Sequence, residues 1–317
     1  MRCPSLHELP PPPPGKRGWP WTDASVQLPD VMPDGQPWPV MTIVTPSYDQ
    51  GPFIEETIRS VLLQGYPSLE YFVIDGGSKD DSVAILRKYE KWLTYWVSEP
   101  DNGQSDAINK GFCGATGEIF GWLNSDDIYE HDAVPLVAKY FAKTQDCGLL
   151  YGNGWYIDER GEKTKRCNWI RPFDRRRLLT FNFILQPAAF WRRSIWECTG
   201  GLNTALRWTM DWEWLLRATA LVHPHYLRVD LARWRVHPDI KTISGGWERR
   251  AEIAEISKKY GGVWQPTYLA YRLDWLLWRM TRYLGNGLIG QMARYLLASI
   301  SWTLKMTVWR GRYLADG

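Results

Sequence analysis

The sequence is poor in cysteine, and it has no cysteine pair with the spacing of a metal site. Its five cysteines are odd in number and far apart: Cys3, Cys113, Cys147, Cys167 and Cys198. A disulfide framework and a zinc knuckle are therefore not expected. The N-terminus also lacks a basic patch followed by an apolar run of signal-peptide length, so we expect a cytoplasmic protein.

A strong charge bias is absent as well. The chain has 38 Lys and Arg against 35 Asp and Glu, a formal net charge of +3 over 317 residues. This excess is too small for a domain that neutralises many phosphates, so no nucleic-acid partner is expected. With 44% hydrophobic and 23% charged residues, the composition excludes a disordered tail protein and a collagen-like chain.

Tryptophan is the one residue type in unusual supply, with 20 copies. Its ring favours positions where one edge is apolar and the other wet, which include membrane interfaces. The length allows one large domain or two moderate ones, at roughly 100 to 200 residues per domain.

The pattern along the chain changes near residue 41. Prolines are frequent in residues 1–40, and because they cannot sustain a helix or a central strand we expect an extended arm there. From Met41 to about Phe141, short β-rich runs alternate with helical stretches, which is typical of a layered α/β domain. Beyond Leu149 the alternation weakens, and this half is expected to complete the sheet and shape a second binding surface.

The first half predicts four buried strands, each followed by polar residues. The strands are expected at residues 42–45, 71–74, 94–97 and 118–123, and the helices from Gly51-Pro52 and over residues 82–89 and 105–113. In such sheets, ligands bind outside the carboxyl ends of the strands. The segments TPSYDQG, IDGGSKDD, SEPDNGQSDAINKG and LNSDD therefore carry the candidate site.

Two of these strand ends are acidic. Asp75 precedes Gly76-Gly77 and is suited to accept hydrogen bonds from a base NH or a ribose hydroxyl, although a turn role is the alternative. Asn124-Ser125-Asp126-Asp127 follows the fourth strand. Mg²⁺ and Mn²⁺ prefer oxygen ligands, so this end suits a metal–nucleotide complex, with one acid as ligand and the other as a cap or supporting group.

In combination, the segments TIVTPSYDQGPFIEETIRSVLLQGYP, YFVIDGGSKDDS, EPDNGQSDAINKGF and GWLNSDD resemble the nucleotide-sugar half of family 2 glycosyltransferases. The resemblance continues through QPAAFWRRSIWECTGGLN, MDWEWLLR and RVHPDIKT, to about Thr242. It implies an α/β protein with the A-type glycosyltransferase fold, a mixed central sheet flanked by helices. A catalytic domain is then expected over residues 41–261, with a nucleotide-sugar half at 41–130 and an acceptor half at 131–261.

The same resemblance implies roles for individual residues. Pro46, Tyr48 and Asp75 should contact the nucleoside, while Asp106 and Lys110 should face the nucleotide-sugar.

The metal-binding D-x-D motif of the family aligns with Asn124-Ser125-Asp126, which implies bound Mg²⁺ or Mn²⁺. Asn124 stands where many relatives have Asp. Its carbonyl oxygen accepts hydrogen bonds but carries no charge, so Asp126 is expected to be the main ligand. His237 in RVHP matches a position where relatives often place a late metal or phosphate ligand, and a purely structural histidine is the alternative.

Glycosyl transfer needs a base within reach of the acceptor hydroxyl. By family position this base is Asp211, although Met210 replaces the usual Glu. An N-terminal helix residue is the alternative role for Asp211, and Glu213 is a rival base. Arg175–Arg177 is read as a solvated surface run, with phosphate binding as the other option.

Residues 262–317 hold seven Lys or Arg and two Asp, a net +5 against −2 for the rest of the chain. Apolar and basic residues separate onto two helical faces from Pro266 onward, with Trp275 and Trp278 beside the arginines. A second stretch has ten residues between Arg294 and Lys305, which is too short to span a bilayer. We expect an amphipathic tail lying on a membrane surface; packing on the protein or on a sister subunit is the alternative.

The sequence thus predicts an inverting glycosyltransferase that is peripheral on the cytoplasmic membrane. The donor is a nucleotide-diphosphate sugar, most often a UDP-sugar in this family, and the acceptor is a saccharide or lipid-linked saccharide. A metal-dependent nucleotidyltransferase and a non-catalytic sugar-binding module of the same fold are the alternatives.

Overall fold

The structure, a computed structural model, divides the chain into two compact units. The first contains Met1–Phe173 and Phe183–Ile240, and the second contains Asp174–Asn182 and Lys241–Gly317. The structure describes residues 1–238, 240, 245–281, 291–292, 295–296 and 299.

A nine-stranded sheet forms the centre of the first unit, in the order β3-β2-β1-β4-β8-β6-β9-β5, with β7 paired to β6. The strands are β1 Met41–Ser47, β2 Leu69–Asp75, β3 Tyr95–Ser98, β4 Ile119–Trp122, β5 Ile128–Tyr129, β6 Leu149–Ile157, β7 Lys163–Arg166, β8 Ala189–Arg192 and β9 His225–Arg235. Strands β1 to β4 are parallel to one another. From β8 onward antiparallel pairs are added, so the sheet is mixed.

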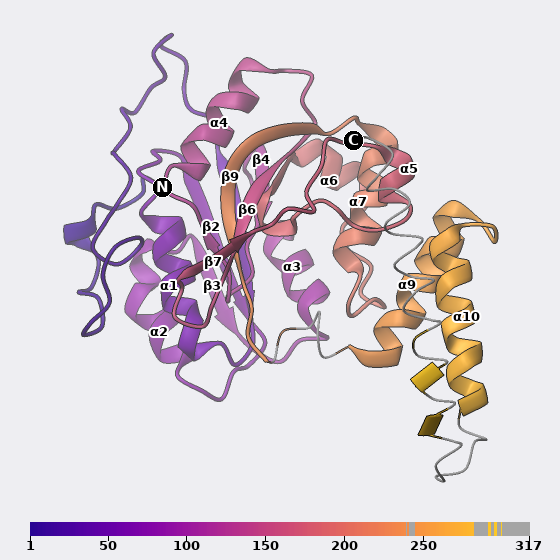
Figure 1. Cartoon of the computed structure of the whole chain (residues 1–317). Helices are drawn as coiled ribbons and strands as arrows, with labels where there is room; N and C mark the ends of the chain where they lie inside the picture. The colour runs from indigo at the N-terminus through magenta and orange to yellow at the C-terminus, as the bar shows by residue number, and fades with distance from the viewer. Residues whose placement is uncertain (239, 241–244, 282–290, 293–294, 297–298, 300–317) are drawn as a thin grey trace. The chain divides into compact units, whose positions relative to one another are not determined.

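Helices cover both faces of this sheet. They are α1 Gly51–Leu62, α2 Ser82–Tyr89, α3 Gln104–Cys113, α4 Ala133–Lys143, α6 Arg193–Thr199 and α7 Met210–Leu221. Because right-handed crossovers step from β1 to β3 in one direction and return to β4 in the other, α1 and α2 lie on one face and α3 on the opposite face. Figure 1 shows this arrangement, with α6 and α7 on the α3 side.

The sequence pattern explains these elements. Pro52 stands in the first turn of α1, where its missing N–H costs nothing, and Ile54, Ile58 and Val61 form the buried face of that helix. Burying each such side chain contributes roughly 1.5 to 3 kcal/mol. The four predicted parallel strands and the three helices between them are confirmed, with ends shifted by a few residues.

The proline-rich segment 1–40 has almost no regular structure, yet it packs closely on the first unit. Trp21 and Trp38 are buried. The buried guanidinium of Arg59 in α1 donates hydrogen bonds to the backbone carbonyls of Pro10, Pro20 and Trp21. The arm is therefore held through its backbone carbonyl groups. The prolines prevent regular backbone hydrogen bonding in this segment, so these carbonyl groups need other donors.

The second unit contains the short α5 (Arg175–Leu178), α9 (Gly246–Gly261) and α10 (Pro266–Thr281). Gln265 donates to the carbonyl oxygen of Leu179 at 2.7 Å, and Thr267 donates to that of Thr180. Arg250 of α9 pairs with the buried Asp274 of α10. The second unit thus includes residues upstream of residue 262. The roles predicted for residues 1–40, 41–261 and 262–317 stay predictions.

The first predicted tail helix corresponds to α10, whereas most of the second stretch lies outside the described residues. Within the described part of the chain, no helix is long and apolar enough to cross a membrane.

Candidate active site

The parallel strands bring the predicted nucleoside residues to one edge of the sheet. Ser47 pairs with Asp75 at the ends of β1 and β2, and Asp75 pairs with Ser98 at the end of β3. Pro46 is buried one residue before the end of β1, and the adjoining Tyr48 is 60% exposed. Tyr48 is therefore the only one of these rings or carboxylates that stands open to solvent at this edge.

Asp75 is fully buried, and its carboxylate has four donors. Its Oδ2 accepts from the backbone N–H groups of Gly77 and Ser78 and from the hydroxyl of Ser98. Its Oδ1 accepts only from the Ser78 hydroxyl. Gly77 has a φ of 83°, which curls the chain back over the carboxylate. Asp75 thus shapes the turn that follows β2, and its Oδ1 accepts one hydrogen bond where a carboxylate oxygen can accept two. Its contact with the nucleoside stays a prediction.

Asp106 and Lys110 lie four residues apart in α3 and so share a helix face. The Asp106 carboxylate accepts from the backbone N–H of Asn102 at 3.1 Å. Lys110 pairs with Glu99 at 2.5 Å, and this hydrogen bond raises the pKa of the lysine, which keeps it charged. α3 therefore presents one acid and one cation on the same face.

Asp126 and His237, 111 residues apart in sequence, meet at the end of β4, with Nε2 of His237 3.1 Å from Oδ2 of Asp126. Arg235, a residue that the sequence analysis did not single out, holds this corner together. Its buried guanidinium donates to the backbone carbonyl of Asp126 and to the carboxylate of Glu56. Its backbone N–H donates to Asp127.

Asp127 is a supporting residue in this corner. It is fully buried, and burial, reinforced by the neighbouring charge of Asp126, raises its pKa well above the ordinary carboxyl value. Of these two adjacent acids, Asp126 is the one whose carboxylate contacts the imidazole of His237.

The corner suits a hard divalent cation that arrives with a diphosphate. Such a cation keeps several positions for water and phosphate oxygens, so one carboxylate and one imidazole are enough protein ligands. Among the described residues, no group of three or more His, Cys, Asp or Glu is placed to hold a metal ion by itself.

The side chain of Asn124 is hydrogen-bonded on both its oxygen and its nitrogen. Its carbonyl oxygen accepts from Nε2 of Gln104 and from Nε1 of Trp122, both at 2.7 Å. Its amide nitrogen faces Asp127 and Gln186. Gln104 and Gln186 lay in segments already quoted for the family, but amide residues follow no spacing rule that would have marked them.

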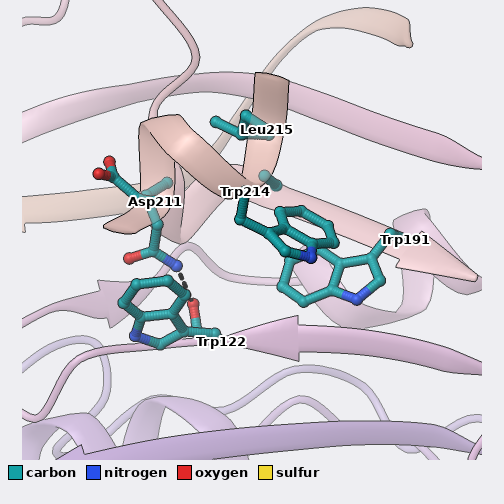
Figure 2. Close-up of a pocket in the computed structure, with 7 residues that line it drawn as sticks. Trp122, Trp191, Asp211, Trp214 and Leu215 are labelled. Carbon is teal, nitrogen blue, oxygen red and sulfur yellow. Dashed lines mark hydrogen bonds between the residues drawn. The ribbon is translucent and has the colours of Figure 1, made fainter. Parts of the chain in front are cut away.

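Asp211 stands in the first turn of α7 and lines a small cavity of about 10 Å³, which is the size of one water molecule. The cavity is lined by Trp122, Gln186, Ala189, Trp191, Asp211, Trp214 and Leu215. Figure 2 shows the Asp211 carboxylate directed away from the rings of Trp214 and Trp191, whose centroids are 4.5 Å apart.

The rival base, Glu213, is part of the scaffold. Its carboxylate is 3% exposed and pairs with Arg217 through two donors, at 2.8 and 3.0 Å. Arg217 also donates to the carbonyls of Thr199 and Gly201 and so ties α7 to the Gly200-Gly201 turn. The Glu213 carboxylate thus helps to fix the start of α7, and the role of Asp211 as the base stays a prediction.

The arginine run lies in the second unit. The Asp174 side chain accepts from the backbone N–H groups of Arg176 and Arg177 and so caps α5. The interpretation as a solvated surface run stays a prediction, with phosphate binding as its alternative.

The site thus combines acidic side chains at the ends of parallel strands with one more carboxylate, Asp211, beside a tryptophan-lined cavity in the mixed half of the sheet. The family model "Glycosyl transferase family 2" matches residues 42–199. An uncharacterized glycosyltransferase of Mycobacterium tuberculosis (strain CDC 1551 / Oshkosh) is 31% identical, over 68% of this chain and 84% of that protein. The chain belongs to glycosyl transferase family 2, and the predicted resemblance is confirmed.

Solved structures agree on the fold. Residues 1–349 of S. aureus TarS, in complex with UDP-GlcNAc, match with a TM-score of 0.57 and 15% identity, over 84% of this chain and 81% of that one. The mannosyltransferase PcManGT from Pyrobaculum calidifontis, in complex with GDP-Man and Mn²⁺, matches with a TM-score of 0.54 and 17% identity, over 88% of both chains. The predicted A-type fold is thereby confirmed, and the chain is a glycosyltransferase.

Proposed function

We propose that this glycosyltransferase moves a sugar from a nucleotide-diphosphate donor to an acceptor hydroxyl, with inversion at the anomeric carbon. The observation that carries the proposal is the contact of Asp126 with His237, because a bare turn would not need an imidazole from 111 residues away. The donor types in the structural neighbours, UDP-GlcNAc and GDP-Man, support a nucleotide-sugar. A UDP-sugar is our first choice.

In this proposal the donor binds along the carboxyl ends of β1 to β4. The remaining acceptor position of Asp75 Oδ1 suits a base NH or ribose hydroxyl. Tyr48 follows Ser47, the residue that pairs with Asp75, and its exposed ring would stack on the base. The ammonium group of Lys110 is suited to the diphosphate. Asp126 and His237 would hold Mg²⁺ or Mn²⁺. A divalent cation there would offset the negative charge that develops on the leaving diphosphate.

Asp211 acts as the general base. Its carboxylate accepts the proton of the acceptor hydroxyl as that oxygen attacks the anomeric carbon, on the face opposite the departing diphosphate. The bond to the diphosphate breaks as the new glycosidic bond forms. The place of Asp211 in the first turn of α7, in the lining of the tryptophan-rich cavity, supports this assignment.

We further propose that the acceptor is a saccharide carried on a lipid and that the second unit brings the enzyme to the membrane. On α10, Leu269, Leu273 and Leu276 are exposed at helical spacing. The guanidinium groups of Arg272 and Arg279 lie 5.1 and 5.3 Å from the ring of Trp275. An exposed apolar stripe beside cations and an aromatic ring suits the surface of an anionic membrane.

A donor-hydrolysis screen tests the reaction without a known acceptor. Wild-type protein is incubated with UDP-, GDP- and dTDP-sugars, with and without Mn²⁺, and release of nucleoside diphosphate is measured. Slow release from at least one donor is expected. Pyrophosphate release from a nucleoside triphosphate and a sugar phosphate would instead indicate a nucleotidyltransferase, and binding without any turnover would indicate a sugar-binding module.

A further inference from the structure

The side chain of Asn124 uses all of its hydrogen-bonding capacity. Its Oδ1 accepts from Gln104 Nε2 and Trp122 Nε1, both at 2.7 Å. Its Nδ2 lies 3.3 Å from Oδ2 of Asp127 and 3.4 Å from Oε1 of Gln186. A side-chain amide has two acceptor positions on oxygen and two donor hydrogens on nitrogen, so none is left over.

The chemistry of the partners fixes which way this amide faces. An indole N–H can only donate, so Trp122 requires the oxygen of Asn124 on its side. The nitrogen must then face the Asp127 carboxylate and the Gln186 carbonyl. An aspartate carboxylate at position 124 would accept from Trp122 as well, but it would have no hydrogen to donate to Gln186 or to Asp127.

These bonds connect the two sides of the site. Gln104 begins α3, two residues before Asp106. Gln186 begins the 3-10 helix η3 (Gln186–Ala188) and lines the same cavity as Asp211. The Gln186 Nε2 group also donates to the backbone carbonyl of Trp122 at 2.6 Å, so the orientation of Gln186 is fixed at both ends of its amide.

We propose that Asn124 is a positioning residue rather than a metal ligand. It holds Gln186 beside Asp211 and ties that cavity wall to the start of α3, and the divalent cation is left to Asp126 and His237. The asparagine in place of the usual aspartate is then a functional requirement of the amide network. The turnover part of this inference rests on the proposed function, whereas its metal-binding and folding parts do not.

Mn²⁺ binding gives the first test. Electron paramagnetic resonance measures free Mn²⁺ in titrations of the wild type, Asn124→Ala and Asp126→Ala, each with UDP present. Asn124→Ala should leave the dissociation constant within about threefold of wild type, while Asp126→Ala should weaken it by about tenfold or more, since a charged oxygen ligand is lost. Equal weakening in both variants would make Asn124 a ligand and overturn the proposal.

Coupling between positions 124 and 186 gives the second test. Urea unfolding is measured for Asn124→Ala, Gln186→Met and the double variant. Each variant raises the equilibrium constant of unfolding by some factor relative to the wild type. If the two side chains act through one bond, the factor for the double variant should be about threefold smaller than the product of the two single factors. Multiplicative effects would contradict the link. Should Asn124→Ala fail to fold, Asn124→Ser takes its place in the cycle.

Turnover separates positioning from simple structural support. With whichever of UDP-GlcNAc or GDP-mannose is hydrolysed, Asn124→Ala and Gln186→Met should each lower kcat about tenfold with KM within about threefold, and the double variant should be no slower than the worse single variant. An unchanged kcat would overturn the proposal. A wild type that binds Mn²⁺ but hydrolyses no donor would remove the proposed function, and the metal and unfolding results would still decide the role of Asn124.

Discussion

At the scale of single residues, the geometry of the site depends on buried side chains whose hydrogen bonds fix the positions of the candidate functional residues. The Asp126–His237 contact exists because Arg235, fully buried, binds the backbone of Asp126 and the carboxylate of Glu56. Leaving such a charge without its partners would cost several kcal/mol, so the corner stays in one arrangement. Arg235 thus fixes the geometry of the corner in which Asp126 and His237 are proposed to hold the metal ion.

Replacing Asp126 should remove metal-dependent nucleotide binding. Asp126→Ala removes the one carboxylate that contacts His237, and the imidazole of His237 alone is not a preferred ligand for Mg²⁺ or Mn²⁺. Calorimetric titration with UDP and GDP, with and without Mn²⁺, measures the effect. Asp146 is exposed, so Asp146→Ala is the matched control and should bind the nucleotides as the wild type does. Unchanged nucleotide affinity in Mn²⁺ would count against this site.

Replacing Asp211 should affect the chemical step and spare the binding of the donor. Asp211→Asn is expected to lower turnover by a factor on the order of 100 to 10,000 with donor affinity intact, since a general base acts in the transition state. Glu213→Gln should instead lower thermal stability, because it breaks the buried pair with Arg217. Normal turnover in Asp211→Asn would transfer the base role to another residue.

At the scale of elements, the sequence predicted the parts that depend on local pattern. Strands β1 to β4 and helices α1 to α3 follow from apolar runs, from Pro52 and from glycine turns, all of which are local signals. The packing of residues 1–40 against Arg59 did not follow, because a carbonyl–guanidinium contact leaves no trace in hydropathy. Asp126 and His237 were marked by family motifs, whereas Gln186 became visible only when the fold placed it in a cavity with Asp211.

Arg59 should decide whether the N-terminal arm stays attached. Arg59→Met removes the donors from the buried carbonyl groups of Pro20 and Trp21 and from the partly buried carbonyl group of Pro10. A buried carbonyl group costs about 1 to 3 kcal/mol when left unsatisfied. The free energy of unfolding in urea should therefore fall by about 3 kcal/mol or more, with faster proteolysis inside residues 1–40.

Arg2→Met is the control for this prediction. Arg2 is itself in the arm and contacts Asp30 and the carbonyl of Leu28 within it, with a side chain that is 42% exposed. An exposed pair of this kind contributes less than about 1 kcal/mol. Equal losses in the two variants would show that the buried carbonyl contacts do not hold the arm.

At the scale of the whole molecule, the second unit is expected to act as the membrane contact. Leu269→Glu and Leu276→Glu place charges in the exposed stripe of α10 and should reduce flotation with anionic liposomes, as should removal of residues 262–317. The substitutions are the cleaner test, because the deletion also removes Asp274, the partner of Arg250. Each cation near the surface contributes about 1 kcal/mol, so high salt should release only part of the protein.

The matched control for the flotation experiment places a glutamate at Leu221, an exposed leucine of α7 that lies outside the second unit. Leu221→Glu should float as the wild type does. Flotation that survives the α10 substitutions would assign the contact to another surface, and no flotation of the wild type would make α10 a packing or oligomer element.

The stereochemical course of donor cleavage tests the central claim most directly. Proton NMR follows the anomeric signal while the wild type, with Mn²⁺, cleaves a nucleotide-diphosphate α-sugar. Inverting transfer with Asp211 as the base should give free nucleoside diphosphate together with the β-anomer as the first sugar product, and much slower release of both with Asp211→Asn. Initial release of the α-anomer, or cleavage that is independent of Asp211, would contradict it.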